Sequence, residues 1–427
     1  MRPVHRGPTP AGSALAIVAE GFLSRLSFGL IGLALPLYAL RLGMTLSQVG
    51  VLVSANVVLM LVAKPVLSPL ADRFGHRRML IVAIAGRSLV GLLLAVAVAP
   101  WQLFAIRLLY GLTQALRDPP LNALIADAGG AKRVASVFGW YHTAKNVAAS
   151  LGRAAAGVLL AVGPSQDYRR VFVVAFVLSL LPLGVVARFL RPGSGRPDAG
   201  PESDPPADSP ADSAPDPRDR VWTLTVLGFL FGTTAGMMNL FPAIATVYFH
   251  LDPAQIGFIM LGSAVVVIVA GPVFGWLADH RSRALVLSVR GFANIVSSLM
   301  YLALPSVWGV GASKVVDDTG KAAFRPAWGS VMAEAARRHP GRRARVLSVI
   351  DVGEDAGDAA GPILAGGLLA LGGLPLMLGT RCGVAAVTEV WTWWVTHRQR
   401  PAPVRAAAAG SADAVRPASR AGPADGA

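Results

Sequence analysis

Residues 68–78 read SPLADRFGHRR, and residues 275–283 read GWLADHRSR. Each stretch follows a long apolar run, places an aspartate directly after it, and continues with basic residues. The two aspartates, Asp72 and Asp279, lie 207 residues apart. A second copy of one short polar signal, in the same apolar setting, indicates that the chain contains an internal repeat.

Other residues of unusual type match at the same shift of 207 residues. The matching pairs are Gln48 and Gln255, Gly50 and Gly257, Pro65 and Pro272, Arg107 and Lys314, Pro119 and Pro326, and Asp127 and Glu334. We therefore predict two similar halves in parallel orientation, related by an axis along the membrane normal, which is a known transporter plan.

The composition excludes most soluble proteins. The chain has 427 residues, of which 54% are hydrophobic and 15% charged, and its mean hydropathy is +0.55. A typical soluble domain is about 25% charged. Cys382 is the single cysteine, so no intrachain disulfide can form. These properties predict an all-α integral membrane protein.

Long apolar runs predict twelve transmembrane helices, because backbone polar groups in hydrocarbon must be satisfied within each segment. The expected spans are 12–40, 47–71, 78–99, 101–126, 134–162, 168–190, 221–249, 254–278, 284–304, 306–335, 346–371 and 374–396. They divide into two six-helix bundles.

Basic residues mark one side of the membrane. Four short loops on that side hold twelve Lys and Arg residues, whereas the opposite loops hold three. Cytoplasmic loops are enriched in Lys and Arg. We therefore expect a multi-pass protein of the inner (cytoplasmic) cell membrane, with both termini in the cytoplasm.

Two segments cannot pack a core. Residues 192–220 are rich in Pro, Asp and Ser, and the tail from 401 is rich in Ala, Pro and Gly. We expect disorder in both. The predicted organisation is a first half over 1–191, a cytoplasmic linker over 192–220, a second half over 221–400 and a cytoplasmic tail over 401–427.

The 68–78 stretch resembles the loop signature G-x-x-x-D-R-x-G-R-R of the major facilitator superfamily, with Ser68 in place of the first glycine. The resemblance implies the twelve-helix fold and a loop that docks on the other half to close the cytoplasmic side. A purely topological role is the alternative. We expect Asp127 to pair with Arg77 or Arg78, and Glu334 with Arg281 or Arg283. The candidate gating residues are Asp72, Arg73, Gly75, Arg77, Arg78, Asp127, Asp279 and Glu334.

A second motif resembles the G-P-x-x-x-G-G pattern of drug/proton antiporters in the same superfamily. It comprises Gly357, Gly361, Pro362, Gly366 and Gly367, and lies on the eleventh span. In those antiporters the motif belongs on the fifth span. Small residues let helix backbones approach closely, so simple helix packing is the alternative role.

Charged residues inside the spans are the most informative for function, because a charge at bilayer depth usually faces a cavity or a partner. The candidate proton and substrate pathway residues are Glu20, Arg25, Arg107, Lys145, Asp317, Asp318, Lys321, Glu354, Asp355 and Asp358. Those of the tenth and eleventh spans recur at helical spacing, so each set shares one face.

The first-half charges are mainly basic and the second-half charges mainly acidic. Lys321 is expected to neutralise Glu354 or Asp355. We further expect Arg25, Arg107 or Lys145 to pair with second-half acids in one conformation only, so that protonation or substrate would bias alternating access. Permanent ion pairs are the alternative. Arg107 with Gly111 resembles the superfamily's fourth-span R-x-x-x-G element, which is linked to proton transfer.

The sequence therefore favours a secondary transporter that moves a small organic molecule, with proton-coupled efflux as the leading form. Proton-coupled or facilitated uptake is the alternative, and a non-transporting membrane sensor ranks below it. No enzymatic metal or nucleophile motif and no phosphate-binding loop is present, so we expect no enzyme, cofactor or metal. The expected partners are the lipid bilayer, the substrate and protons, without nucleic acid or an obligate protein partner.

Overall fold

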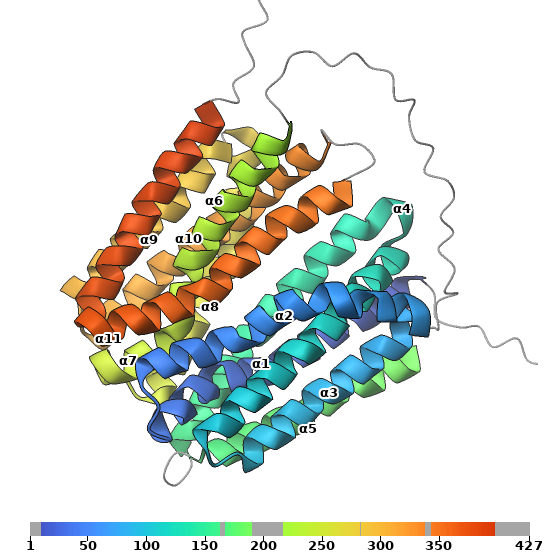
Figure 1. Cartoon of the computed structure of the whole chain (residues 1–427), viewed down its shortest axis with the longest axis horizontal. Helices are drawn as coiled ribbons and strands as arrows, with labels where there is room; N and C mark the ends of the chain where they lie inside the picture. The colour runs from blue at the N-terminus through green and yellow to red at the C-terminus, as the bar shows by residue number, and fades with distance from the viewer. Residues whose placement is uncertain (1–9, 163–166, 190–216, 282, 338–342, 398–427) are drawn as a thin grey trace, which may run out of the picture.

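The computed structural model describes residues 10–162, 167–189, 217–281, 283–337 and 343–397 (Figure 1). The described residues form eleven α-helices and one 3₁₀ helix. They are α1 (Pro10–Arg41), α2 (Leu46–Phe74), α3 (His76–Val96), α4 (Pro100–Val162), α5 (Tyr168–Phe189), α6 (Pro217–Met237), η1 (Met238–Leu240), α7 (Phe241–Phe249), α8 (Pro253–His280), α9 (Arg283–Ala303), α10 (Val307–Arg337) and α11 (Arg343–His397). The all-α prediction is confirmed.

The expected spans map onto these helices with three differences. Helix α4 covers the fourth and fifth spans, α11 covers the eleventh and twelfth, and the seventh span is divided among α6, η1 and α7. In α11 the division falls at Gly373, whose φ of 66° lies in the left-handed region that glycine adopts without strain. The expected boundary between 371 and 374 therefore coincides with this kink.

Helix α4 must reverse direction even though its hydrogen-bonded pattern is unbroken. Arg117 and Tyr141 are 24 residues apart in the sequence, which would place them about 36 Å apart along a straight helix. Instead, the Arg117 guanidinium donates a hydrogen bond of 3.1 Å to the Tyr141 hydroxyl. The chain therefore folds back between these residues, as two consecutive spans require.

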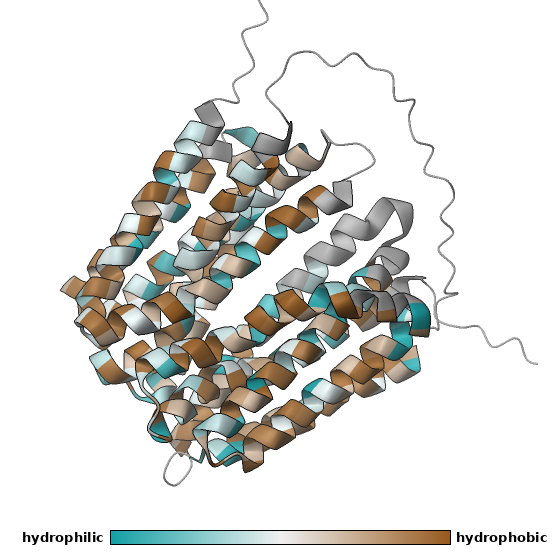
Figure 2. Ribbon diagram, viewed as in Figure 1, coloured by the Kyte–Doolittle hydropathy of each residue, from teal (hydrophilic) through white to brown (hydrophobic). Residues whose placement is uncertain are grey.

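Eight segments are long and apolar enough to cross a membrane by length and composition. Hydrophobic residues cover much of the helical surface (Figure 2), and large side chains such as Val62, Trp276 and Leu371 are exposed. Helix α10 is not among the eight segments. Its charged residues lower its hydropathy, and among them Lys314 and Asp317 are buried inside the protein.

The helices before and after the 192–220 segment pack into separate bundles (Figure 1). Helices α1 to α5 contact one another, α6 to α11 contact one another, and α2 with α11 and α4 with α8 form the main contacts between the bundles. This arrangement agrees with the two expected halves. The expected tail and most of the expected linker lie outside the described residues, although α6 begins at Pro217, within the expected linker range.

Among the described residues, the hydrophobic core is continuous across the bundles at one end only, which we call the joined end. One cluster there includes Leu33 of α1 and Leu369 of α11. Toward the other end, which we call the divided end, one cluster around Ile17 and Leu80 belongs to the first half. Another around Trp328 belongs to the second half. The halves are thus packed together at the joined end and separate at the divided end.

Glycines allow the close approach at the joined end. A Cβ atom added to Gly50 of α2 would lie 2.2 Å from the Pro362 carbonyl oxygen of α11. A Cβ atom added to Gly157 of α4 would lie 2.4 Å from the Pro253 carbonyl oxygen of α8. The two contacts are related by the internal repeat, because Gly50 corresponds to Gly257, which lies beside Gly157.

Candidate functional site

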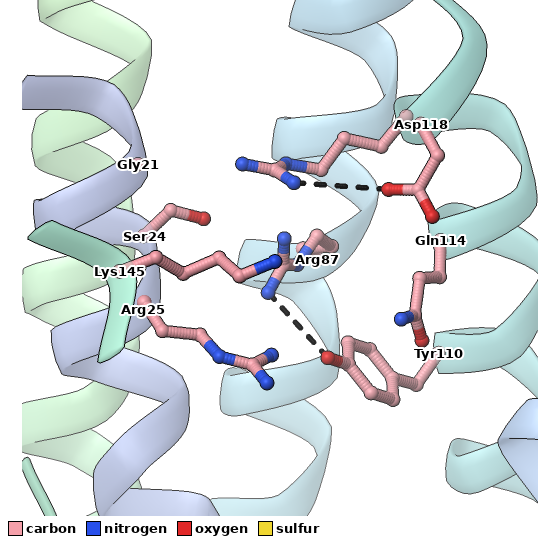
Figure 3. A pocket seen from close by; sticks show the side chains of 9 residues that line it. Gly21, Ser24, Arg25, Arg87, Tyr110, Gln114, Asp118 and Lys145 are labelled. Carbon is pink, nitrogen blue, oxygen red and sulfur yellow. Dashed lines mark hydrogen bonds and ion pairs between the residues drawn. The ribbon is translucent and has the colours of Figure 1, made fainter. Parts of the chain in front are cut away.

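A polar pocket of about 90 Å³ lies inside the first half (Figure 3). Helices α1, α3 and both parts of α4 supply its walls, so four expected spans converge on it. Its lining residues are Gly21, Ser24, Arg25, Arg87, Tyr110, Gln114, Arg117, Asp118 and Lys145. Two of them, Arg25 and Lys145, are sequence candidates for the pathway.

Glu20 is fully buried beside this pocket and paired with Arg117. One guanidinium nitrogen of Arg117 donates to both carboxylate oxygens of Glu20, at 2.7 and 2.8 Å. The same nitrogen bonds the Tyr141 hydroxyl, and a second nitrogen lies 3.8 Å from Asp118. Arg117 therefore neutralises Glu20 and ties α1 to the two parts of α4. The sequence reasoning listed Glu20 but overlooked its partner.

Arg87 crosses from α3 into the same pocket and is 4% exposed. Its guanidinium stacks 4.0 Å from the Phe28 ring centre and lies 3.5 Å from the Tyr110 hydroxyl. Cation–π contact partly replaces the lost hydration of the charge. Helix α3 packs against α4 and α5 and directs this side chain inward.

The other cations of the first half differ in their partners. Arg107 donates to the carbonyl oxygens of Leu52 and Val53 on α2, at 3.3 and 3.0 Å. Arg25 and Lys145 make no hydrogen bond or ion pair with any described residue, although Lys145 lies 5.6 Å from the Tyr141 ring centre. Arg107 thus contributes to packing of α2 on α4, while Arg25 and Lys145 present free charges to the pocket.

The second half holds a buried ion network around Asp317. This carboxylate is completely buried and contacts three cations: Arg381 of α11, Lys321 at 2.8 Å and Arg290 at 3.6 Å. Arg381 also donates to Asn294 at 2.9 Å. The network joins α9, α10 and the second part of α11, and it neutralises the buried carboxylate of Asp317.

Asp318 is neutralised on its own helix. It pairs with Lys314 and, at 2.8 Å, with Lys321, and it accepts a bond of 2.6 Å from Ser263. The prediction that these charges share one face of the tenth span is confirmed. The predicted pairing of Lys321 with Glu354 or Asp355 is wrong, because residues three and four apart on one helix are nearer neighbours.

The acids of α11 form a stripe with fewer partners. Glu354 pairs with Arg325 at 3.1 Å, and Asp358 accepts a bond of 2.9 Å from Asn239. Asp351 and Asp355 make no hydrogen bond or ion pair with any described residue, although Lys64 of α2 acts on both electrostatically. The surplus negative charge of the second half is therefore on α11.

The glycine motif contacts two different neighbours. A Cβ atom at Gly357 would lie 2.1 Å from the Phe229 carbonyl oxygen of α6, and one at Gly361 would lie 2.5 Å from Gly236. Gly366 faces Leu46 of α2, at 2.8 Å. The first glycines therefore pack α11 within its own half, and Pro362 and Gly366 pack it against the other half. Gly367 has open space beside it.

The structure leaves the gating loop largely untested. The side chains of Asp72, Asp127 and Asp279 lie outside the described residues. Arg77 donates to the Ala187 carbonyl oxygen of α5, at 2.5 Å, and so contacts its own half. Gly75 has a φ of 88°, which joins α2 to α3 through a conformation suited to glycine. The proposed roles of Arg73, Arg78 and Glu334 stay predictions.

Arg117, Asp118 and Arg381 are the charged residues that the sequence reasoning missed. Each is a charge inside a largely apolar segment, which is a signal of an internal partner or cavity. Among the described residues, no group of three or more His, Cys, Asp or Glu side chains is placed to hold a metal ion.

Two helical bundles built from a repeated sequence, a joined end, and buried charged groups inside the apolar helices are typical of a secondary transporter. Residues 20–247 and 224–422 match the family described as Major Facilitator Superfamily. The chain belongs to this family of transporters, which are not enzymes.

Curated relatives cover most of the chain. "Multidrug resistance protein MdtG" of Serratia proteamaculans is 25% identical over 393 residues, covering 90% of this chain and 93% of the relative. The Salmonella typhimurium protein of the same name is 26% identical over 398 residues, covering 89% and 94%. "Tetracycline resistance protein, class B" of Escherichia coli is 30% identical over 142 residues, covering 33% and 34%.

Solved structures agree on the fold. A bacterial homologue of the human lysosomal transporter Spinster, in an inward-facing and occupied conformation, superposes with a TM-score of 0.73. It is 15% identical, and the match covers 93% of this chain and 100% of the other.

Proposed function

We propose that this protein is a proton-coupled exporter of small organic molecules, located in the cell membrane with both termini in the cytoplasm. It works by alternating access between two halves, the first over 1–191 and the second over 221–400. The described state is then open to the cytoplasm, because the divided end carries the Arg-rich loops and the starts of α1 and α6. The observation that carries this proposal is a core shared by both halves at one end only.

The distribution of free charge supports coupling to protons. Arg25 and Lys145 in the first half, and Asp351 and Asp355 in the second, make no hydrogen bond or ion pair with any described residue. When the divided end closes, the two sets approach each other across the cavity. A deprotonated Asp355 would be attracted to the basic half and a protonated one would not, so the proton changes the relative stability of the two states.

The direction of transport rests on the relatives. The names of these relatives describe multidrug and tetracycline resistance. Export of the drug from the cell would provide such resistance. Uptake of a small metabolite, by proton symport or facilitated diffusion, is the second candidate, since the fold permits either direction. A sensor without transport is less favoured, because the helices of both halves pack into a complete transporter fold.

Proton flux in proteoliposomes tests the proposal. Purified protein is reconstituted with an internal pH dye, and a panel of organic cations, anions and neutral compounds is added under an imposed pH gradient. We expect proton movement opposite to that of at least one compound. Movement in the same direction would support symport, and no gradient dependence for any transported compound would refute proton coupling.

Variants of the acidic stripe locate the coupling group. Asp355→Asn should abolish gradient-driven transport while equilibrium exchange of substrate continues. Asp318→Asn is the matched control, because Asp318 is already neutralised by Lys314 and Lys321 on its own helix. Equal effects of the two substitutions would contradict a special role for α11.

A further inference from the structure

The charges around the first-half pocket do not balance. Four of its lining residues are cations and one is an acid, with Glu20 buried behind them. Both carboxylates contact the same cation, since Arg117 lies 2.7 Å from Glu20 and 3.8 Å from Asp118. Arg25, Arg87 and Lys145 therefore have no carboxylate partner among the described residues.

Arg87 shows most clearly that a partner is missing. It is 4% exposed, and its Nε nitrogen is buried without a hydrogen-bond partner in the described structure. Its terminal nitrogen reaches Tyr110 only at 3.5 Å. A buried guanidinium is costly unless it is paired, and cation–π contact with Phe28 recovers part of that cost. An anion in the pocket would supply the missing acceptor.

We propose that this pocket binds the anionic group, a carboxylate or phosphoryl group, of the transported molecule. The inference rests on the proposed function and adds a substrate class to it. Arg25 and Lys145 supply charge from α1 and the second part of α4, and Arg87 supplies a planar guanidinium that suits carboxylate and phosphate oxygens. Figure 3 shows these side chains directed into one space from opposite walls.

Neutral groups complete the site. The Gln114 amide oxygen accepts a bond of 3.2 Å from Asn56, and Figure 3 shows its amide nitrogen on the pocket side. Tyr110 and Ser24 add hydroxyl donors. The pocket volume of about 90 Å³ has room for several water molecules. It therefore accommodates the charged head of a substrate, while the remainder extends toward the space between the halves.

The same cations are the expected partners of the α11 carboxylates when the halves close. A bound anion and a deprotonated Asp355 would therefore compete for Arg25 and Lys145. Protonation of Asp355 would leave the cations available to the substrate, so binding of the proton and binding of the anion would be thermodynamically linked.

Direct binding to the full-length purified protein tests the inference. Benzoate and phenyl phosphate are titrated calorimetrically, with benzamide and benzylammonium as neutral and cationic controls of similar shape. We expect the anions to bind and the controls to bind at least tenfold more weakly. Arg25→Gln and Lys145→Gln should each weaken anion binding about 10- to 100-fold, as expected for one hydrogen bond to a charged group.

Two further variants separate binding from folding. Arg25→Lys retains the charge and should retain most of the affinity. Arg170→Gln removes a cation from a pair with Asp167, where the Arg170 side chain is 58% exposed, and should leave binding unchanged. Anion affinity equal to that of benzamide, or full affinity in both Arg25→Gln and Lys145→Gln, would overturn the inference.

The proteoliposome assay distinguishes this inference from the proposed function. Proton-driven transport of benzylammonium without any anion transport would support the function and refute the anion site. Anion binding that depends on Arg25 and Lys145, without any proton movement, would support the site and refute proton coupling.

Discussion

Replacement of Gly50 by alanine should open the joined end. The Gly50 Cβ position lies 2.2 Å from the Pro362 carbonyl oxygen, whereas ordinary contacts begin at 3.4 Å. Helix α2 must therefore retreat from α11 by about 1.2 Å at this point. Both atoms belong to rigid helix backbone, so rotation of a side chain cannot relieve the clash.

Overpacking of this kind costs about 1–3 kcal/mol. Only the state in which the joined end is closed carries that cost, so the population with this end open should rise about 5- to 150-fold. Gly366→Ala acts from the opposite helix, where the nearest backbone oxygen is 2.8 Å away, and should give a smaller shift. Gly367→Ala is the matched control, because nothing lies within 4 Å of that position.

Cysteine labelling measures the shift. Ser47→Cys is introduced into a Cys382→Ser background, since Ser47 borders the contact with Gly366. A membrane-impermeant maleimide is applied to intact cells and to inverted vesicles. We expect faster labelling in Gly50→Ala, from the side that faces the joined end. Equal rates in Gly50→Ala and Gly367→Ala, with both proteins folded, would refute the reasoning.

Three other outcomes follow from the ion pairs and the loop. Arg117→Gln should lower stability by about 3–5 kcal/mol, because it leaves Glu20 buried without a partner. The double variant Arg117→Gln with Glu20→Gln should recover part of this loss when all four proteins are compared by thermal unfolding. Strict additivity of the two single effects would contradict a direct ion pair. Asp317→Asn should lower stability by a similar amount, about 3–5 kcal/mol, because it leaves the buried Arg290 and Arg381 without a carboxylate. A melting temperature equal to that of the parent protein would show that the network is not stabilising. Gly75→Ala should lower the free energy of unfolding by about 1–3 kcal/mol through backbone strain alone, since the φ of Gly75 is 88° and no atom lies within 4 Å of the Cβ position. A stability loss no greater than that of Gly367→Ala would contradict this prediction.

The positions of the spans could be predicted because they depend on local properties. A run of apolar residues must form a helix in hydrocarbon, wherever its neighbours lie. The kink at Gly373 falls at the expected boundary between the spans 346–371 and 374–396. The shared face of Asp317, Asp318 and Lys321 followed from helical periodicity, and their mutual pairing confirms it.

The partners of the charges were much less predictable. Lys321 was expected to pair with an acid of the eleventh span, but it pairs with acids of its own helix. Glu20 was named as a pathway residue, but its partner Arg117 was not. Several cations and several acids were available to each group, and the sequence carries no information about the rotation of one helix against another.

The sequence by itself determined the membrane class, the order of the helices, the internal repeat and the surplus of opposite charge in the two halves. Only the tertiary structure decided that Arg117 neutralises Glu20, 97 residues away, and that Arg381 reaches Asp317, 64 residues away. The reason is physical: helix formation is governed by each segment and its solvent, whereas ion pairing depends on atoms that only packing brings within about 4 Å.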